Sequence, residues 1–103
     1  MEKNTPHYAL AVIQADVRRP AGNAFTSTAK NNAWALGLTL PEMLEVISGL
    51  RRKQFYKSMT TYNDHRLWHD VYHVNTHGLE IYIKVTYRPS GGPPVISFKE
   101  KNA

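Results

Sequence analysis

The spacing of apolar residues changes half-way along the chain, and this change limits the possible folds more than any other feature. Apolar side chains recur every three or four residues around Met43, Val46 and Ile47, which is the period of an α-helix. Across residues 79–88 they occupy every second position, which is the period of a β-strand with one apolar face. Helices followed by adjacent strands predict an α+β fold, in which an antiparallel β-sheet packs on N-terminal helices.

Capping signals predict three helices in the first half of the chain. Each expected start carries a hydroxyl side chain that can accept a hydrogen bond from the first turn. The helices are expected to begin after Thr5, after Thr26 or Ser27, and after Thr39, and to end before Pro20, at Gly37 and near Leu50. The third start is the clearest, because Glu42, three residues after Thr39, completes a capping box.

Segments rich in aromatic and β-branched residues predict four strands in the second half. The strands are expected over residues 55–62, 67–74, 79–88 and 95–100. Turn formers fill residues 89–94, so the last two strands should form a hairpin. We expect the large rings of Trp34 and Trp68 to lie in the core.

Length and composition narrow the class of protein. A chain of 103 residues has the usual size of one domain, so residues 1–103 are expected to form a single domain. No cysteine is present, which removes disulfide frameworks and thiolate zinc sites. No stretch approaches the ~20 consecutive apolar residues of a membrane helix, so we expect a cytoplasmic protein without a membrane segment.

The excess of basic charge is confined to the second half of the chain. Residues 1–50 hold four Lys or Arg and four Asp or Glu, whereas residues 51–103 hold nine and four. The formal net charge of +5 therefore arises in the second half alone. This asymmetry favours a polyanionic partner, with nucleic acid the first candidate. A surface made soluble by lysines is the alternative that charge alone leaves open.

Side chains that suit phosphoryl transfer from RNA lie on the expected strands of the basic half. They are Lys57, Ser58, Thr60, Tyr62, His69, His73, Tyr82, Lys84 and Lys99. RNA carries its own nucleophile, the 2′-hydroxyl, so the protein must only move protons and stabilise charge on the phosphate. The solvated face of a sheet carries the same residue types, so periodicity leaves both interpretations open. Motifs for nucleotide binding and for serine or cysteine nucleophiles are missing.

Four histidines recur every four residues, at positions 65, 69, 73 and 77. On a helix they would share one face and could bind a metal. In a strand, residues four apart are separated by roughly 13 Å, too far to share one zinc ion. We therefore expect neither a metal nor another cofactor.

Four blocks of the second half resemble a known family. They are residues 55–62 (FYKSMTTY), 68–72 (WHDVY), 82–84 (YIK) and 95–101 (VISFKEK). Together with the opening MEKNTPH, they closely resemble the motility quorum-sensing regulator toxins (MqsR), and the similarity runs nearly end to end. The resemblance implies a fold like that of the RelE and YoeB ribonucleases. It also implies a metal-independent endoribonuclease that favours GCU sites in messenger RNA.

The same resemblance implies the partners of the protein. It would be the toxin of a type II toxin–antitoxin pair, inhibiting translation and growth, and it would be neutralised by an MqsA-type antitoxin. DNA would be contacted only through that antitoxin. Two rival functions stay open: a non-catalytic RNA-binding or ribosome-associated regulatory module, and a structural partner protein.

The family's catalytic positions match Lys57, Tyr82 and Lys99, and a fourth position, glutamine in the best-known member, holds His69 here. We expect both lysines to hold the scissile phosphate and Tyr82 to position it. The imidazole of His69 either transfers a proton or positions RNA. This departure from the family pattern leaves its role open.

Further contacts with RNA are expected from side chains close to these positions in the sequence. They are Tyr56, Ser58, Lys84 and Arg88. Asp70 and Glu80 are weaker candidates for acid–base chemistry. The turn at residues 89–94 is longer than we expect in the family, a departure that bears on substrate preference.

Overall fold

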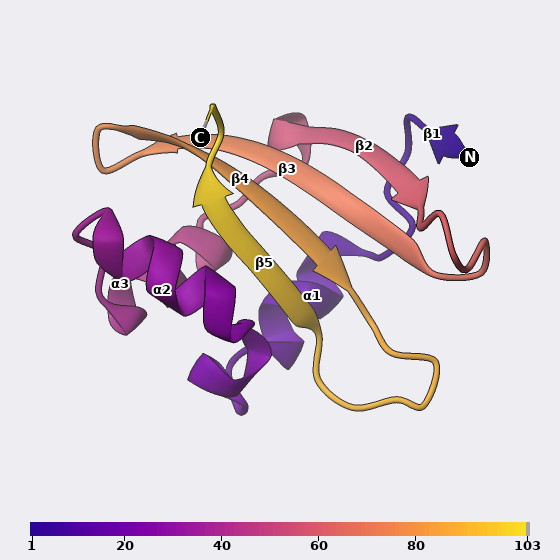
Figure 1. Ribbon diagram of the computed structural model, residues 1–103, viewed down its shortest axis with the longest axis horizontal. Helices are drawn as coiled ribbons and strands as arrows, with labels where there is room; N and C mark the ends of the chain where they lie inside the picture. The colour runs from indigo at the N-terminus through magenta and orange to yellow at the C-terminus, as the bar shows by residue number, and fades with distance from the viewer. Residues whose placement is uncertain (103) are drawn as a thin grey trace.

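The computed structural model describes residues 1–102, which form an antiparallel sheet with helices on one side (Figure 1). The elements are β1 (Glu2–Lys3), α1 (Leu10–Asp16), the 3₁₀ helix η1 (Ala21–Ala24), α2 (Ser27–Ala35), α3 (Leu40–Ser48), the 3₁₀ helix η2 (Arg52–Gln54), β2 (Phe55–Thr60), β3 (Trp68–Thr76), β4 (Leu79–Thr86) and β5 (Val95–Glu100). The strand order follows the chain order, β1-β2-β3-β4-β5, and every neighbouring pair is antiparallel. The predicted α+β class is confirmed, while the likeness to the RelE and YoeB fold stays an expectation.

The two later helices begin where their capping residues predict. Thr26 is the N-cap of α2, and its side chain accepts a hydrogen bond from the backbone N–H of Ala29 at 3.0 Å. Thr39 and Glu42 form the predicted capping box at the start of α3. These starts depend on contacts within four residues, which is why local sequence is sufficient to predict them.

The first helix begins later than its sequence suggests. The prediction of a start after Thr5 is wrong, because α1 begins at Leu10 and has no side-chain cap. The backbone N–H groups of His7 and Tyr8 instead donate to the carboxylate of Asp70, at 3.1 and 2.9 Å. Asp70 is fully buried, so it holds this segment against the sheet and delays the first helical turn.

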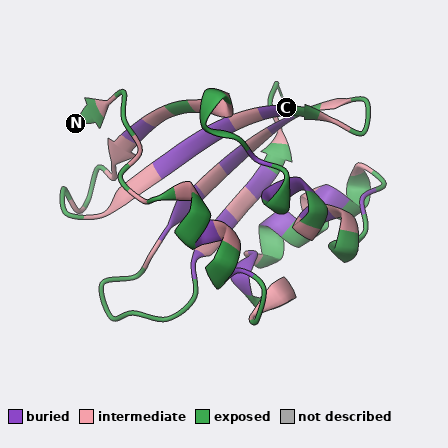
Figure 2. Cartoon of the chain, turned by 180° about the vertical axis from the view of Figure 1, so that it is seen from behind, coloured by how far each residue is buried: buried purple, intermediate pink, exposed green. Residues whose placement is uncertain are grey.

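The core lies between the helices and one face of the sheet. It combines Ile13, Val17, Ala29, Ala33, Met43, Val46 and Ile47 from the helices with Tyr72, Val74, Ile81, Ile83, Val85, Ile96 and Phe98 from the strands. Buried and less buried positions alternate along most of β4 and β5 (Figure 2), as expected for strands with one face in the core. The helices lie on that side of the sheet, and the second face is left without them (Figure 1).

Neither tryptophan is a core residue, contrary to the prediction from ring size. Trp34 is 79% exposed, because the face of α2 that packs on β5 consists of the small residues Ala29 and Ala33. Trp68 is half-buried at the start of β3, where its ring stacks on His7 with centroids 5.2 Å apart. Large rings are often buried, but a helix that packs closely on a sheet through small residues leaves its large side chains on the outer side.

Both edges of the sheet are partly covered. The two-residue strand β1, which periodicity had not indicated, pairs Glu2 with Met59 on the free edge of β2. At the other edge, Phe25 forms a parallel bridge with Ile96 of β5. Covered edges leave fewer unpaired backbone groups for association with other chains. Within the residues described, no helix is both long and apolar enough to cross a bilayer.

Candidate active site on the open face of the sheet

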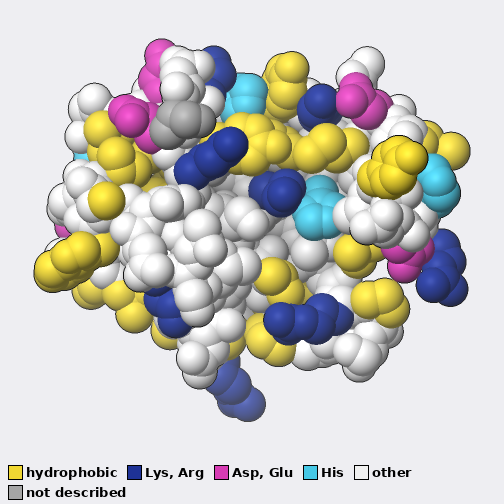
Figure 3. Space-filling model, in the orientation of Figure 1, with side chains coloured by type: hydrophobic (Ala, Val, Ile, Leu, Met, Phe, Trp, Pro, Cys, Tyr) yellow, Lys and Arg dark blue, Asp and Glu magenta, His cyan; other side chains and the backbone are white. Residues whose placement is uncertain are grey.

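The strand register determines which side chains meet on the face opposite the helices, called the open face below. Residues directly opposed in an antiparallel pair place their side chains on the same face. His73 of β3 pairs with Tyr82 of β4, which pairs with Lys99 of β5. Two residues along β3 from His73, Val71 lies opposite Lys57 of β2 and Lys84 of β4. Figure 3 accordingly shows basic side chains (dark blue) and histidines (cyan) on this face of the molecule.

An irregularity in β2 adds Tyr56 to this face. The register of β2 against β3 shifts between Phe55 and Lys57, so Tyr56 is the extra residue of a bulge. A bulge re-aims a side chain that strict alternation would place on the other face. The ring of Tyr56 consequently stacks on the imidazole of His73, with centroids 4.3 Å apart and planes inclined by 22°.

Three rings therefore form a row across strands β2 to β4, with a lysine ammonium close to each end. The imidazole of His73 also packs against Tyr82, with centroids 5.6 Å apart. Lys99 Nζ lies 5.2 Å from the centroid of Tyr82, and Lys57 Nζ lies 5.5 Å from that of Tyr56. Such distances are within the range of cation–π attraction. We call Tyr56, His73 and Tyr82 the aromatic row.

Charge and burial set the protonation states around the row. Burial raises the pKa of Tyr82, and the nearby charge of Lys57 opposes this shift only in part. A hydrogen bond to Glu2 raises the pKa of Lys57, whose ammonium lies 2.9 Å from the Glu2 carboxylate. At neutral pH, Tyr82 therefore keeps its hydroxyl proton and Lys57 keeps its positive charge.

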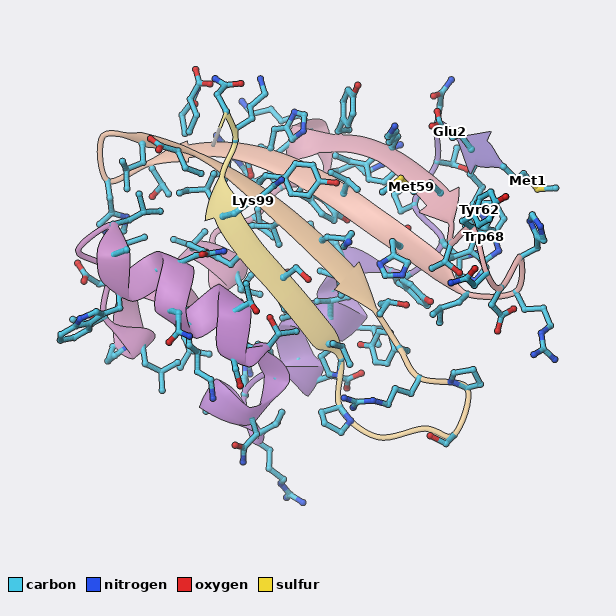
Figure 4. All side chains as sticks on the ribbon, viewed as in Figure 1. Met1, Glu2, Met59, Tyr62, Trp68 and Lys99 are labelled. Carbon is cyan, nitrogen blue, oxygen red and sulfur yellow. The ribbon has the colours of Figure 1, made fainter. Side chains whose placement is uncertain are left out.

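The Glu2 carboxylate comes from β1, and sequence reasoning had assigned it no role. Figure 4 shows Glu2 and Met59 at the β1–β2 side of the open face and Lys99 across the sheet on β5. The side chain of Lys57 is 27% exposed and that of Glu2 is 61% exposed. The pair is accessible to solvent, so an anion can displace Glu2 from Lys57 at small cost.

His69 lies half-buried on the open face, with its ring nitrogens shielded from solvent. Its partner in the register is Met59 of β2. Both ring nitrogens are buried and have no hydrogen-bond partner among the residues described. Burial, followed by the charge of Lys84, lowers the pKa of His69. His69 is therefore a neutral, enclosed imidazole at pH 7 in this conformation.

The structure does not bring every expected residue to the site. Ser58 is buried on the helix side of the sheet, where its hydroxyl donates to Asp70 at 2.6 Å. Asp70 itself is buried on that side and holds the N-terminal segment. Arg88 is exposed in the connection after β4, beyond the end of the strand. Glu80 is exposed on β4, and its charge acts on His73.

A pocket of about 210 Å³ adjoins the aromatic row on the β5 side. Its wall is formed by Thr28 and Asn32 of α2 and by Tyr82, Lys84 and Lys99 of the sheet. The side-chain amide of Asn32 donates to the carbonyl of Phe98 at 3.1 Å, which ties α2 to β5. The open face thus continues from the row into a polar hollow lined by two cations.

Comparison with known proteins shows the family of the chain. A family model described as "Motility quorum-sensing regulator, toxin of MqsA" matches residues 5–100. The chain belongs to the MqsR toxin family. A curated MqsR relative from Escherichia coli (strain K12), named "mRNA interferase toxin MqsR", is 43% identical over 102 residues. The alignment covers 98% of this chain and 100% of that relative, so the predicted family is confirmed over nearly the whole length.

The MqsR-type site differs from its sequence-based prediction chiefly at His73. The sequence places His73 among the polar residues of the strands, but no signal within β3 shows that it faces Tyr82. Only the pairing with β4 and the bulge in β2 place it inside the row. Among the residues described, no three His, Asp or Glu side chains converge as a possible metal site.

Proposed function

We propose that this MqsR family member is a toxin that cuts messenger RNA on the open face of its sheet, by attack of a 2′-hydroxyl on the adjacent phosphate. The observation that carries the proposal is the placement of Lys57 and Lys99 at the two ends of the aromatic row. Lysine ammonium groups that face the substrate can stabilise the negative charge that develops on a phosphate in the transition state. The name of the E. coli relative, an mRNA interferase toxin, points to the same activity.

The reaction needs no metal in this proposal. The 2′-oxygen forms a bond to phosphorus while the bond from phosphorus to the 5′-oxygen breaks, leaving a 2′,3′-cyclic phosphate and a 5′-hydroxyl. Lys57 and Lys99 hold the phosphate oxygens, and Tyr82 donates a hydrogen bond from its protonated hydroxyl. The raised pKa of Tyr82 suits a hydrogen-bond donor and not a base.

The surrounding side chains are proposed to hold the RNA chain. Tyr56 is 53% exposed and offers a ring on which a base can stack. Lys84 lies beside the pocket next to Lys99, which gives a second phosphate a position on the β5 side. His69 is proposed to position RNA indirectly, through the residues of this chain that surround it. GCU-like sites are proposed as the preferred cutting sequence.

A partner is proposed on the basis of the family. The matching family model is described as the toxin of MqsA. We propose that an MqsA-type antitoxin binds and neutralises this chain in the cytoplasm, and that contact with DNA occurs only through the antitoxin. The chain would then reduce growth only when it is free of that partner.

A module that binds RNA without cutting it is the second candidate, favoured by the exposed ring of Tyr56 beside cations. One assay separates the two functions. Purified protein is incubated in EDTA with a defined single-stranded RNA that contains a GCU, and the ends of the fragments are identified. New 5′-hydroxyl ends support the proposal. Salt-sensitive binding without cuts supports the second candidate, and 5′-phosphate ends or an absolute metal requirement would overturn the proposed mechanism.

A further inference from the structure

The two histidines of the open face differ in access to substrate. The ring nitrogens of His69 are both buried without a partner. His73 is half-buried and makes no side-chain hydrogen bond to the residues described, yet its nitrogens are not among the buried atoms. A molecule lying on the open face can therefore reach the nitrogens of His73 and not those of His69.

Lys57, beside the row, and Tyr82, within it, are both protonated at neutral pH and cannot accept a proton. Lys57 is held as a cation by Glu2, and Tyr82 is held as a phenol by burial. A protonated ammonium or phenol has no free basic site at neutral pH. His73, packed on Tyr82, is the group in the row that can offer a nitrogen lone pair.

Groups from three segments act on the imidazole of His73. Burial is the largest cause that lowers its pKa, the charge of Lys101 lowers it further, and the charge of Glu80 raises it. Tyr56 of β2 covers one face of the ring, and Lys99 lies beyond Tyr82 on β5. Since the net direction is downward from an ordinary value of 6.5, His73 is mainly neutral at pH 7.

We propose that His73 is the general base that removes the proton from the attacking 2′-hydroxyl, an assignment that rests on the proposed RNA cleavage. As the proton moves to the imidazole, the 2′-oxygen bonds to phosphorus and the bond to the 5′-oxygen breaks. The departing 5′-oxygen takes a proton from water, and the resulting hydroxide takes the proton from the imidazolium. Atoms and charges then balance, and His73 is again neutral.

Stacking on Tyr56 fixes the orientation of the His73 imidazole, the proposed general base. The stacked rings, with centroids 4.3 Å apart and planes inclined by 22°, restrict the imidazole from turning out of the row. The two ring nitrogens are not among the buried atoms. A preorganised base of this kind raises the rate of proton transfer without a step of reorientation.

Single-turnover cleavage from about pH 5 to about pH 8, in EDTA and with protein in excess, tests the assignment. For the wild type we expect the rate to fall on the acid side, as His73 becomes protonated. His73→Phe keeps a ring for the stack but has no nitrogen, so we expect a loss of about a hundredfold and a flat acid side. Binding of an RNA with 2′-deoxyribose at the cutting site should change by less than about threefold, because a base contributes little to ground-state affinity.

Two controls make the result specific. His65→Gln removes an exposed histidine outside the row and should retain the wild-type pH profile. His73→Ala with added imidazole should recover activity in proportion to the neutral imidazole, which a purely structural role does not predict. Circular dichroism confirms that each variant is folded.

Each outcome separates the two proposals. If the wild type cuts RNA and His73→Phe keeps its acid side with a rate within about tenfold, the assignment of His73 is overturned while RNA cleavage stands. Failure of imidazole to restore any activity to a folded His73→Ala protein would also overturn it. If the wild type makes no cuts at any pH, both proposals fail.

Discussion

The ammonium of Lys57 lies 2.9 Å from the carboxylate of Glu2, although the two residues are 55 positions apart. The pair forms because β1 adds to the free edge of β2, which places Glu2 on the open face beside Lys57. The carboxylate of Glu2 thus occupies the position beside Lys57 at which we propose that the scissile phosphate binds. In the absence of RNA, this contact shields the positive charge of Lys57.

Glu2→Gln should tighten binding of RNA, because the phosphate no longer competes with a carboxylate for Lys57. We expect KM to fall by about two- to fivefold at low salt with little change in kcat, as exposed ion pairs contribute at most ~1 kcal/mol. Glu45→Gln removes the same charge from an exposed position of α3, on the helix side of the sheet, and is the matched control. A higher KM for Glu2→Gln would show that Glu2 assists binding.

Lys57→Ala and Lys99→Ala should each slow single-turnover cleavage by about a hundredfold or more, because each removes a charge from the transition state. Lys30→Ala changes an exposed lysine of α2 that does not line the pocket, and it should keep nearly wild-type activity. Rates are measured on the same defined RNA in EDTA. Near-normal cutting by both site variants would remove these lysines from the mechanism.

His69→Gln should lower the cleavage rate by less than about tenfold and leave the shape of the pH profile unchanged. The ring nitrogens of His69 are buried, so they do not reach the substrate, and burial lowers the pKa of His69, so the ring is already neutral at pH 7. Glutamine supplies a donor and an acceptor, as a neutral histidine does. If the variant loses the acid side of the profile, His69 and not His73 is the proton acceptor.

Asp70→Ala should destabilise the fold by about 3 kcal/mol or more, because three donors lose a buried acceptor. These donors are the backbone N–H groups of His7 and Tyr8 and the hydroxyl of Ser58. Urea unfolding measures the change. Asp64→Ala removes a carboxylate that pairs with Arg66 at the surface and should cost less than about 1 kcal/mol. Equal losses for both variants would contradict the role of Asp70.

Expression of the chain alone should arrest bacterial growth, and co-expression with an MqsA-type antitoxin should restore it. The expectation follows from membership of the MqsR toxin family. Growth curves of strains that express the wild type or the Lys57→Ala variant provide the comparison. Normal growth with high levels of active wild-type protein would argue against a toxin.

Local sequence determined most of the secondary structure of this protein. The change of period separates helices from strands, and Thr26 and Thr39 mark the starts of α2 and α3. The family could also be predicted, because its blocks are short, ordered and specific. These features depend on residues within a few positions of each other, so they can be recognised in a single sequence without a structure.

Tertiary structure alone decided which of these residues meet. Glu2 reaches Lys57 through strand pairing, and Asp70 delays α1 through bonds to His7 and Tyr8, more than 60 residues away. A bulge in β2 places Tyr56 on His73, whereas strict alternation would not place adjacent Tyr56 and Lys57 on one face. Strand register and buried hydrogen bonds join distant segments, and their free energy depends on the whole core, so no local pattern encodes them.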